Sequence, residues 1–292
     1  MQKTRKVYRE GEQLLQQIEN TVVPDDAVAI WHLGQESVVV KGAGIVCYFD
    51  PFLSGITVED ESDSLWKRSF APPLDPARIS HANYVFVSHH HGDHLDPITL
   101  RAIHSAARHT MFICPAPIVR LLLQCGIESE RIIGATAHET LRLGAMEVES
   151  IPCMHEEFDV DPDGNYPYLG YVVRMGGITL YHAGDTIGYS GLADRLKACR
   201  IDVALLPING RDVKRSQMDI VGNLGFRDAA DLAVAMEADL VIPMHYDVFP
   251  FNADNPSYFV DYLLREYPEQ KFKMMAVGER LLYVRERLEG AE

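Results

Sequence analysis

The chain has 292 residues, of which 47% are hydrophobic and 24% charged, the balance of an ordinary globular protein. This composition excludes the disordered and collagen-like classes of protein. The formal net charge of −15 repels phosphate backbones, and no basic cluster exceeds Arg211, Lys214 and Arg215, so we expect no nucleic-acid partner.

The first half of the chain alternates short apolar runs with turns. A helix is predicted over Lys3–Glu19, where Leu14, Leu15 and Ile18 share one face. The segment Gly55–Arg78 has no periodicity and is predicted to be a long loop, a kind of segment that often shapes binding sites. Strands are predicted over Ala27–Leu33, Ser37–Lys41, Ile45–Phe49, Tyr84–Val87 and Thr110–Cys114, and helices over Pro97–Arg108 and Pro117–Cys125.

The second half of the chain has the same character. Strands are predicted over Met146–Ile151, Leu169–Arg174, Thr179–His182, Val203–Pro207, Leu240–Met244 and Arg280–Arg285, and helices over Phe226–Ala238 and Ser257–Glu266. No linker rich in Gly, Ser or Pro separates the halves. We therefore predict a single α/β domain over residues 1–292, with two packed sheets covered by helices. In this organisation residues 1–20 are a helical extension, and two pseudo-equivalent halves span about 22–138 and 139–286.

The sequence also indicates a compartment. Its five cysteines are odd in number and form no CxxC pair, which fits a reducing environment. The first twenty residues are polar and lack the apolar core of a signal peptide. No apolar stretch approaches the roughly 18 residues that a membrane helix needs. We expect a cytoplasmic protein without a membrane partner.

A histidine-rich motif directly follows the predicted strand Tyr84–Val87. On extended backbone, His89 and His91 point the same way and can reach one metal ion together. Gly92 is expected to allow a sharp turn, after which Asp93 and His94 can reach a second ion. The side chain of His90 should point away. Imidazole suits zinc, and carboxylate widens the choice to manganese.

Three further candidate ligands lie where later strands end. His155 follows the strand Met146–Ile151, Asp185 follows Thr179–His182, and His245 follows Leu240–Met244. Sites on sheet scaffolds usually form where strands run into loops. We therefore expect the three side chains to join the histidine motif in one metal centre.

The chemistry of such a centre is hydrolytic. A bound divalent ion lowers the pKa of its water to about 7, so hydroxide becomes available for attack on an ester, lactone, amide or phosphodiester. Asp93, beside that water, is a candidate proton acceptor as well as a ligand. Asp50, at the end of Ile45–Phe49, either orients a ligand histidine or forms an ordinary turn before Pro51. Arg211, Lys214 and Arg215 either grip a substrate phosphate or form a solvated loop.

The order of these residues resembles the signature of the metallo-β-lactamase superfamily. The resemblance implies a four-layer αββα sandwich and two divalent ions per chain, zinc or manganese, although one site alone could be filled. By this likeness Asp185 would bridge the ions. One ion would be held by His89, His91 and His155, and the other by Asp93, His94 and His245.

A narrower resemblance is to the L-ascorbate-6-phosphate lactonase group. It is carried by segments scattered over residues 22–260, among them Ala29–Gly34, Cys47–Pro51, Leu180–Asp185, Ile201–Leu205 and Val241–His245. The loop Pro207–Asp212 and the surroundings of His155 depart from that group, so the likeness supports the subfamily better than the substrate. It implies a homo-oligomer that hydrolyses a lactone or related small ester, possibly phosphorylated. The alternatives are a phosphodiesterase acting on a small or lipid phosphodiester, and a non-catalytic metal-binding protein.

Overall fold

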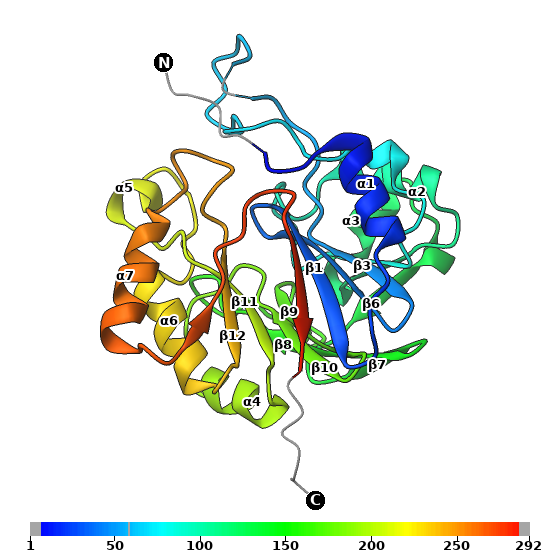
Figure 1. Cartoon of the computed structure of the whole chain (residues 1–292). Helices are drawn as coiled ribbons and strands as arrows, with labels where there is room; N and C mark the ends of the chain where they lie inside the picture. The colour runs from blue at the N-terminus through cyan, green and yellow to red at the C-terminus, as the bar shows by residue number, and fades with distance from the viewer. Residues whose placement is uncertain (1–6, 58, 286–292) are drawn as a thin grey trace, which may run out of the picture.

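The computed structural model describes residues 7–57 and 59–285. Their strands form two seven-stranded sheets that face each other, and helices cover both outer faces (Figure 1). The predicted four-layer αββα sandwich is thereby confirmed. In the part of the chain that the structure describes, none of the helices has both the length and the apolar character needed to cross a bilayer.

The first sheet joins the N-terminal strands to the last strand of the chain. Its order is β14-β1-β2-β3-β4-β5-β6, so that β14 pairs with β1 at one edge. Its strands β1 to β3 are antiparallel, and β3 to β6 run parallel. The bounds of these strands are β1 Ala27–Gly34, β2 Ser37–Gly42, β3 Ile45–Phe49, β4 Tyr84–Phe86, β5 Met111–Pro115, β6 Ile132–Ala135 and β14 Arg280–Val284.

The second sheet is built from the middle of the chain, in the order β13-β12-β11-β10-β9-β8-β7. Its strands β7 to β10 are antiparallel, and β10 to β13 run parallel. Except for β14, the strands of the first sheet come from the first predicted half of the chain and those of the second sheet from the second half. That the two halves are pseudo-equivalent parts of one domain stays a proposal. The strand bounds are β7 Thr140–Leu143, β8 Met146–Pro152, β9 Leu169–Met175, β10 Ile178–His182, β11 Val203–Pro207, β12 Leu240–Met244 and β13 Lys271–Phe272.

The helices divide between the two outer faces (Figure 1). Helices α1 to α3 pack on the first sheet, and α4, α6 and α7 pack on the second. The helix bounds are α1 Gly11–Asn20, α2 Pro97–Ala106, α3 Val119–Gln124, α4 Leu192–Cys199, α5 Val213–Ser216, α6 Phe226–Ala235 and α7 Pro256–Glu266.

Alternation along the strands explains the layers. In β1, Val28 and Ile30 join the core between the sheets, where they meet residues such as Leu205 of β11. Ala29 and Trp31 point to the opposite face and pack with α1. Because successive side chains of a strand face opposite ways, a fully apolar strand can serve two cores at once. This is why β1 is buried along its whole length.

Several predicted elements need correction. Of the helix predicted over Lys3–Glu19, residues 3–6 lie outside the described residues, and residues 7–10 are not helical, so α1 begins at Gly11. The helix predicted over Pro117–Cys125 is a short 3₁₀ turn, Ala116–Ile118, followed by α3. Helix α6 ends three residues earlier than predicted. Strands β6, β7 and β13 and helices α4 and α5 were not predicted.

Candidate metal centre

The histidine motif and the three later candidates meet at one end of the sandwich. The motif follows β4 of the first sheet, and His155, Asp185 and His245 follow β8, β10 and β12 of the second. The loops that follow these four strands therefore lie together at the same end of the two sheets. All seven residues that we predicted as metal ligands are brought together there.

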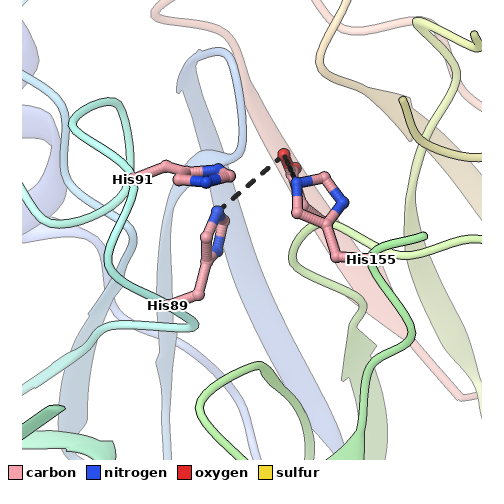
Figure 2. A group of neighbouring side chains, drawn as sticks. His89, His91 and His155 are labelled. Carbon is pink, nitrogen blue, oxygen red and sulfur yellow. Dashed lines mark ion pairs between the residues drawn. The ribbon is translucent and has the colours of Figure 1, made fainter. Parts of the chain in front are cut away.

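The first group of ligand atoms comes from His89, His91, His155 and Asp185, which lie within 4.8 Å of one another. Figure 2 shows the imidazole rings of His89 and His91, both from the histidine motif, converging with the ring of His155 from another segment. The Oδ2 atom of Asp185 lies 4.0 Å from Nε2 of His89 and 3.9 Å from Nε2 of His155. Three imidazoles and a carboxylate are a set of donors that suits a transition metal.

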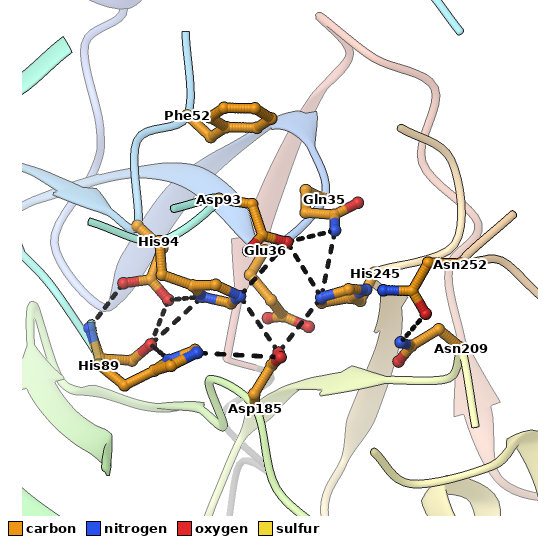
Figure 3. A network of polar contacts seen from close by, with 12 residues as sticks. Gln35, Glu36, Phe52, His89, Asp93, His94, Asp185, Asn209, His245 and Asn252 are labelled. Carbon is orange, nitrogen blue, oxygen red and sulfur yellow. Dashed lines mark hydrogen bonds and ion pairs between the residues drawn. The ribbon is translucent and has the colours of Figure 1, made fainter. Parts of the chain in front are cut away.

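The second group comes from Asp93, His94 and His245, whose ligand atoms also lie within 4.8 Å of one another. Here it is Oδ1 of Asp185 that is near, at 3.3 Å from Nε2 of His94 and 3.4 Å from Nε2 of His245. The two oxygens of one carboxylate thus face two different groups of ligands (Figure 3). This is the geometry that a bridging ligand requires.

The buried nitrogens of the site fit a metal. Within the described residues, Nε2 of His89, His94 and His155 is buried and has no hydrogen-bond partner. Nearly all buried polar groups in native proteins are partnered, by protein, water or a bound ion. These unpartnered atoms all point into the two groups, so a cation would satisfy them.

A hydrogen-bond network behind the site fixes the orientation of His94. Its Nδ1 lies 2.7 Å from Oδ2 of Asp50, which also accepts a hydrogen bond of 2.6 Å from the hydroxyl of Ser88. The other oxygen of Asp50 accepts from the backbone N–H of Ser88 at 2.7 Å. With Nδ1 of His94 held by a carboxylate, Nε2 is left to face the site. Asp50 therefore lies where a residue that orients a ligand histidine would lie.

The electrostatics of the two groups differ. Burial lowers the pKa of His89 well below its ordinary value and that of His155 to about 4. Burial also opposes the charge on His94, but the carboxylates of Asp185 and Asp93 outweigh it and raise the pKa of His94 well above its usual value. The pKa of Asp185 is held well below its ordinary value by His245 and His94, against the effect of burial. The histidines of the second group are thus surrounded by more negative charge than those of the first group.

The backbone takes unusual conformations at the site. Gly184 has φ +57°, and a Cβ there would lie 2.7 Å from Cβ of Ser88, so a glycine is needed to bring Asp185 beside the motif. Two non-glycine residues, Asp50 with φ 40° and His245 with φ 58°, also lie in the left-handed region. Such conformations have an energetic cost and concentrate at functional sites.

One expectation about the motif is wrong. Gly92 does not adopt a positive φ, and a Cβ at this position would meet nothing within 4 Å, so the turn does not require glycine. The turn is closed instead by hydrogen bonds from the backbone N–H of His94 and of Leu95 to the carbonyl of His91, at 3.0 and 2.8 Å.

Sequence reasoning missed two residues in the turn between β1 and β2. Nε2 of Gln35 lies 2.7 Å from Oδ2 of Asp93, to which it donates, and 3.1 Å from Nε2 of His245. Glu36 is fully buried behind the ligands, and burial, with Asp185 second, raises its pKa well above the ordinary value. The only signal in the sequence was that two polar residues, Gln35 and Glu36, lie between two apolar strands. Because Gln35 and Asp93 are 58 residues apart in sequence, no local pattern could predict their contact.

A cavity of about 520 Å³ opens above the ligands. His91, Asp93, Asp185 and His245 form its polar floor, and the predicted loop Gly55–Arg78 contributes Gly55 and Trp66 to its wall.

Arg211, Lys214 and Arg215 are not among the residues that line this cavity. Arg215 pairs with Asp212, with Nε 2.6 Å from Oδ2, and donates to the carbonyl of Asn209 at 2.7 Å. The structure therefore does not bring these three residues to the metal centre.

Comparisons with known proteins identify similar families and folds. A family model described as "Beta-lactamase superfamily domain" matches residues 48–246. A protein of Pyrococcus furiosus described as a UPF0173 metal-dependent hydrolase is 29% identical over 236 residues, which cover 80% of this chain and 90% of that protein. A protein of Escherichia fergusonii described as a probable L-ascorbate-6-phosphate lactonase is 25% identical over 276 residues, 84% of this chain and 77% of that protein.

A solved structure shares the fold. The structure of Igni18, described as a metallo hydrolase from the archaeon Ignicoccus hospitalis, superposes with a TM-score of 0.65. The superposition covers 89% of this chain and 100% of the Igni18 chain, at 22% sequence identity. At this identity the likeness concerns the sandwich architecture alone.

Proposed function

The chain belongs to the beta-lactamase superfamily, and from this membership we propose that it is a metal-dependent hydrolase that opens a lactone or cleaves a related small ester. One observation carries the proposal: the two oxygens of Asp185 face two separate groups of histidines on the floor of a cavity. The Pyrococcus furiosus relative, described as a metal-dependent hydrolase, supports the hydrolase activity, and the Escherichia fergusonii relative, described as a probable lactonase, supports a lactone substrate.

In this proposal the ligands divide between two divalent ions, zinc or manganese. His89, His91 and His155 would hold one ion, and Asp93, His94 and His245 the other, with Asp185 between them. When bound, the ions would supply an acidified water and an electrophile for the substrate carbonyl. Asp50 would keep His94 in the tautomer whose Nε2 lone pair faces the site.

Asp93 has a second task in the proposed reaction. Its carboxylate lines the cavity, is partly exposed, and is held in place by the hydrogen bond from Gln35. It would take the proton of the attacking water as the new bond to the carbonyl carbon forms. The acyl C–O bond then breaks, and the departing oxygen recovers a proton, so that one water converts the ester to a carboxylic acid and an alcohol.

We extend the proposal to the setting of the protein. The substrate is a small molecule rather than a nucleic acid, because no Lys or Arg is among the described residues that line the cavity. Five buried, unpaired cysteines support a cytoplasmic location. A homo-oligomer remains part of the proposal through the lactonase likeness, and light scattering would test it.

Metal removal tests the proposed function. Purified protein should contain divalent metal by mass spectrometry and hydrolyse members of a panel of lactones, esters and phosphodiesters. Dialysis against a chelator should abolish that hydrolysis, and zinc or manganese should restore it. Hydrolysis that persists after the metal content has fallen to zero would contradict the proposal, and hydrolysis confined to phosphodiesters would contradict its ester part.

Asp50→Asn is expected to weaken metal binding about ten- to a hundredfold, the range for residues that orient metal ligands. An amide donates to Nδ1 of His94 and therefore drives the proton to Nε2, where it occupies the ligand lone pair. The measurement is a metal titration monitored by calorimetry, with thermal unfolding to verify the fold. The exposed Asp163→Asn is the matched control and should bind as the wild type does. Equal affinities in both variants would contradict the orienting role.

A further inference from the structure

The cavity above the metal centre has an aromatic wall facing its polar floor. The wall consists of Phe52, Trp66 and Phe249, and Ile220 and Val221 are further apolar residues that line the cavity. In the view of Figure 3, the Phe52 ring lies above Asp93 and Asp185 lies below it. A substrate whose carbonyl reaches the floor must therefore place its remaining atoms against apolar side chains.

The aromatic wall is a connected set of rings. The centroids of Phe52 and Phe249 are 5.7 Å apart, and Trp66 meets Phe249 edge to face at 5.1 Å. Phe251 supports Trp66 from outside the cavity, at 4.8 Å. Phe52 and Phe249 are buried, whereas the side chain of Trp66 is 49% exposed. A large aromatic side chain left half-exposed at a cavity gains burial when an apolar group binds beside it.

The charges that line the cavity also favour an uncharged group on the substrate. The described residues that line it include no Lys or Arg, and Asp219 adds a carboxylate to those of Asp93 and Asp185. The nearby Arg68 is withdrawn: it is fully buried, with its guanidinium 4.5 Å from the Phe52 centroid. Its Nε and Nη1 atoms donate to backbone carbonyls, including that of Phe52 at 3.1 Å, while Nη2 is buried without a hydrogen-bond partner among the described residues. Away from the proposed metal ions on the floor, an anionic substituent on the substrate would therefore meet aromatic rings and the carboxylate of Asp219, with no Lys or Arg to pair with.

We propose that the preferred substrate carries an uncharged aromatic or branched aliphatic group beside the cleaved ester or lactone bond, and that a phosphorylated substituent is rejected. This inference rests on the proposed hydrolase function and names its substrate class. The aromatic wall selects by apolar contact, which discriminates by about ten- to two-hundredfold for small changes in a hydrophobic pocket. Trp66 is the residue that sets this specificity, because its indole is the exposed part of the wall.

Three lactones that share the same lactone ring test the proposal on the metal-loaded enzyme. They are γ-butyrolactone, its phenyl derivative, and a derivative bearing a phosphomethyl group. We expect kcat/KM for the phenyl lactone to exceed that for the parent lactone about tenfold or more. The phosphorylated lactone should be no better than the parent. A higher kcat/KM for the phosphorylated lactone than for the phenyl lactone would overturn the proposal.

Trp66→Ala should reduce the ratio of kcat/KM for phenyl over parent lactone about tenfold, through a higher KM for the phenyl lactone. The matched control is Leu65→Ala, on the same loop and exposed, but outside the residues that line the cavity. It should keep the wild-type ratio. An unchanged ratio in Trp66→Ala would remove Trp66 from the proposal.

A binding measurement separates this inference from the proposed function. The chain contains two tryptophans, and Trp31 is fully buried, so a ligand at the aromatic wall should change the fluorescence of Trp66 alone. The probe is 3-phenylcyclopentanone, which cannot be hydrolysed, compared with cyclopentanone. If no lactone is cleaved, the proposed function fails, but tighter binding of the phenyl ketone, with a signal lost in Trp66→Phe, still supports the apolar site. Equal binding of the two ketones would overturn it.

Discussion

Asp185→Asn is expected to reduce the bound divalent metal from two ions to one or fewer per chain. Its two carboxylate oxygens lie 3.3 and 3.9 Å from Nε2 of His94 and of His155, which belong to different groups. An asparagine offers one neutral oxygen and therefore cannot serve both groups. Hydrolysis should fall on the order of a hundred- to a thousandfold, the loss seen when a group that stabilises transition-state charge is removed.

Metal analysis and kcat/KM, measured on the same preparations, check this expectation. Asp219→Asn is the matched control for metal content, because Asp219 lines the cavity but belongs to neither group of ligands. It should retain two ions. Two ions at full occupancy in Asp185→Asn would refute the bridging role, whatever the activity of that variant.

The cluster of candidate metal ligands could be predicted because each of its parts has its own local signal in the sequence. His89 to His94 follow a buried apolar run within one short segment, and their spacing reflects the periodicity of extended backbone. His155 and Asp185 each stand directly after a strand that hydrophobic pattern reveals. The apolar strands likewise indicate two buried sheets, and the αββα arrangement follows from covering both of their faces.

What could not be predicted depends on contacts between distant segments. Strand β6 is four residues long and contains Gly134, so only its parallel pairing with β5 identifies it as a strand. Gln35 reaches Asp93 across neighbouring strands of the first sheet, and it reaches His245 only when the two sheets pack against each other. The aromatic wall likewise joins Trp66 of the long loop to Phe249, and neither residue has a local pattern that marks it as part of a cavity.

The basic cluster left two alternatives open in the sequence, a grip on a substrate phosphate or a solvated loop. Arg211, Lys214 and Arg215 are grouped in sequence after a strand end, which is where binding residues often lie. In the structure Arg215 pairs with Asp212 and donates to the carbonyl of Asn209 and to Oδ1 of Asn252, so its guanidinium is held by protein groups and does not itself line the cavity. The described wall of the cavity thereby contains aromatic side chains and no Lys or Arg, which is the observation behind the proposed substrate class.

His89→Ala, compared with His90→Ala, is the second variant with a large expected effect. Nε2 of His89 is buried, has no hydrogen-bond partner among the described residues, and faces His155 and Asp185. His90 is exposed and belongs to neither group. Removing the imidazole of His89 takes away one of the three neutral donors of the first group, so that group should lose its ion and hydrolysis should fall on the order of a thousandfold.

His90→Ala removes an imidazole from the adjacent position and should leave metal content and kcat/KM within about twofold of the wild type. Both variants need thermal unfolding curves, because the loss of a buried side chain in His89→Ala lowers stability independently of metal. A folded His89→Ala protein that retains two ions and full activity would contradict the assignment of the first group. Equal losses in the two variants would mean that both substitutions act by disturbing the fold of the segment. The alternation of side chains along the segment would then not determine which histidines are ligands.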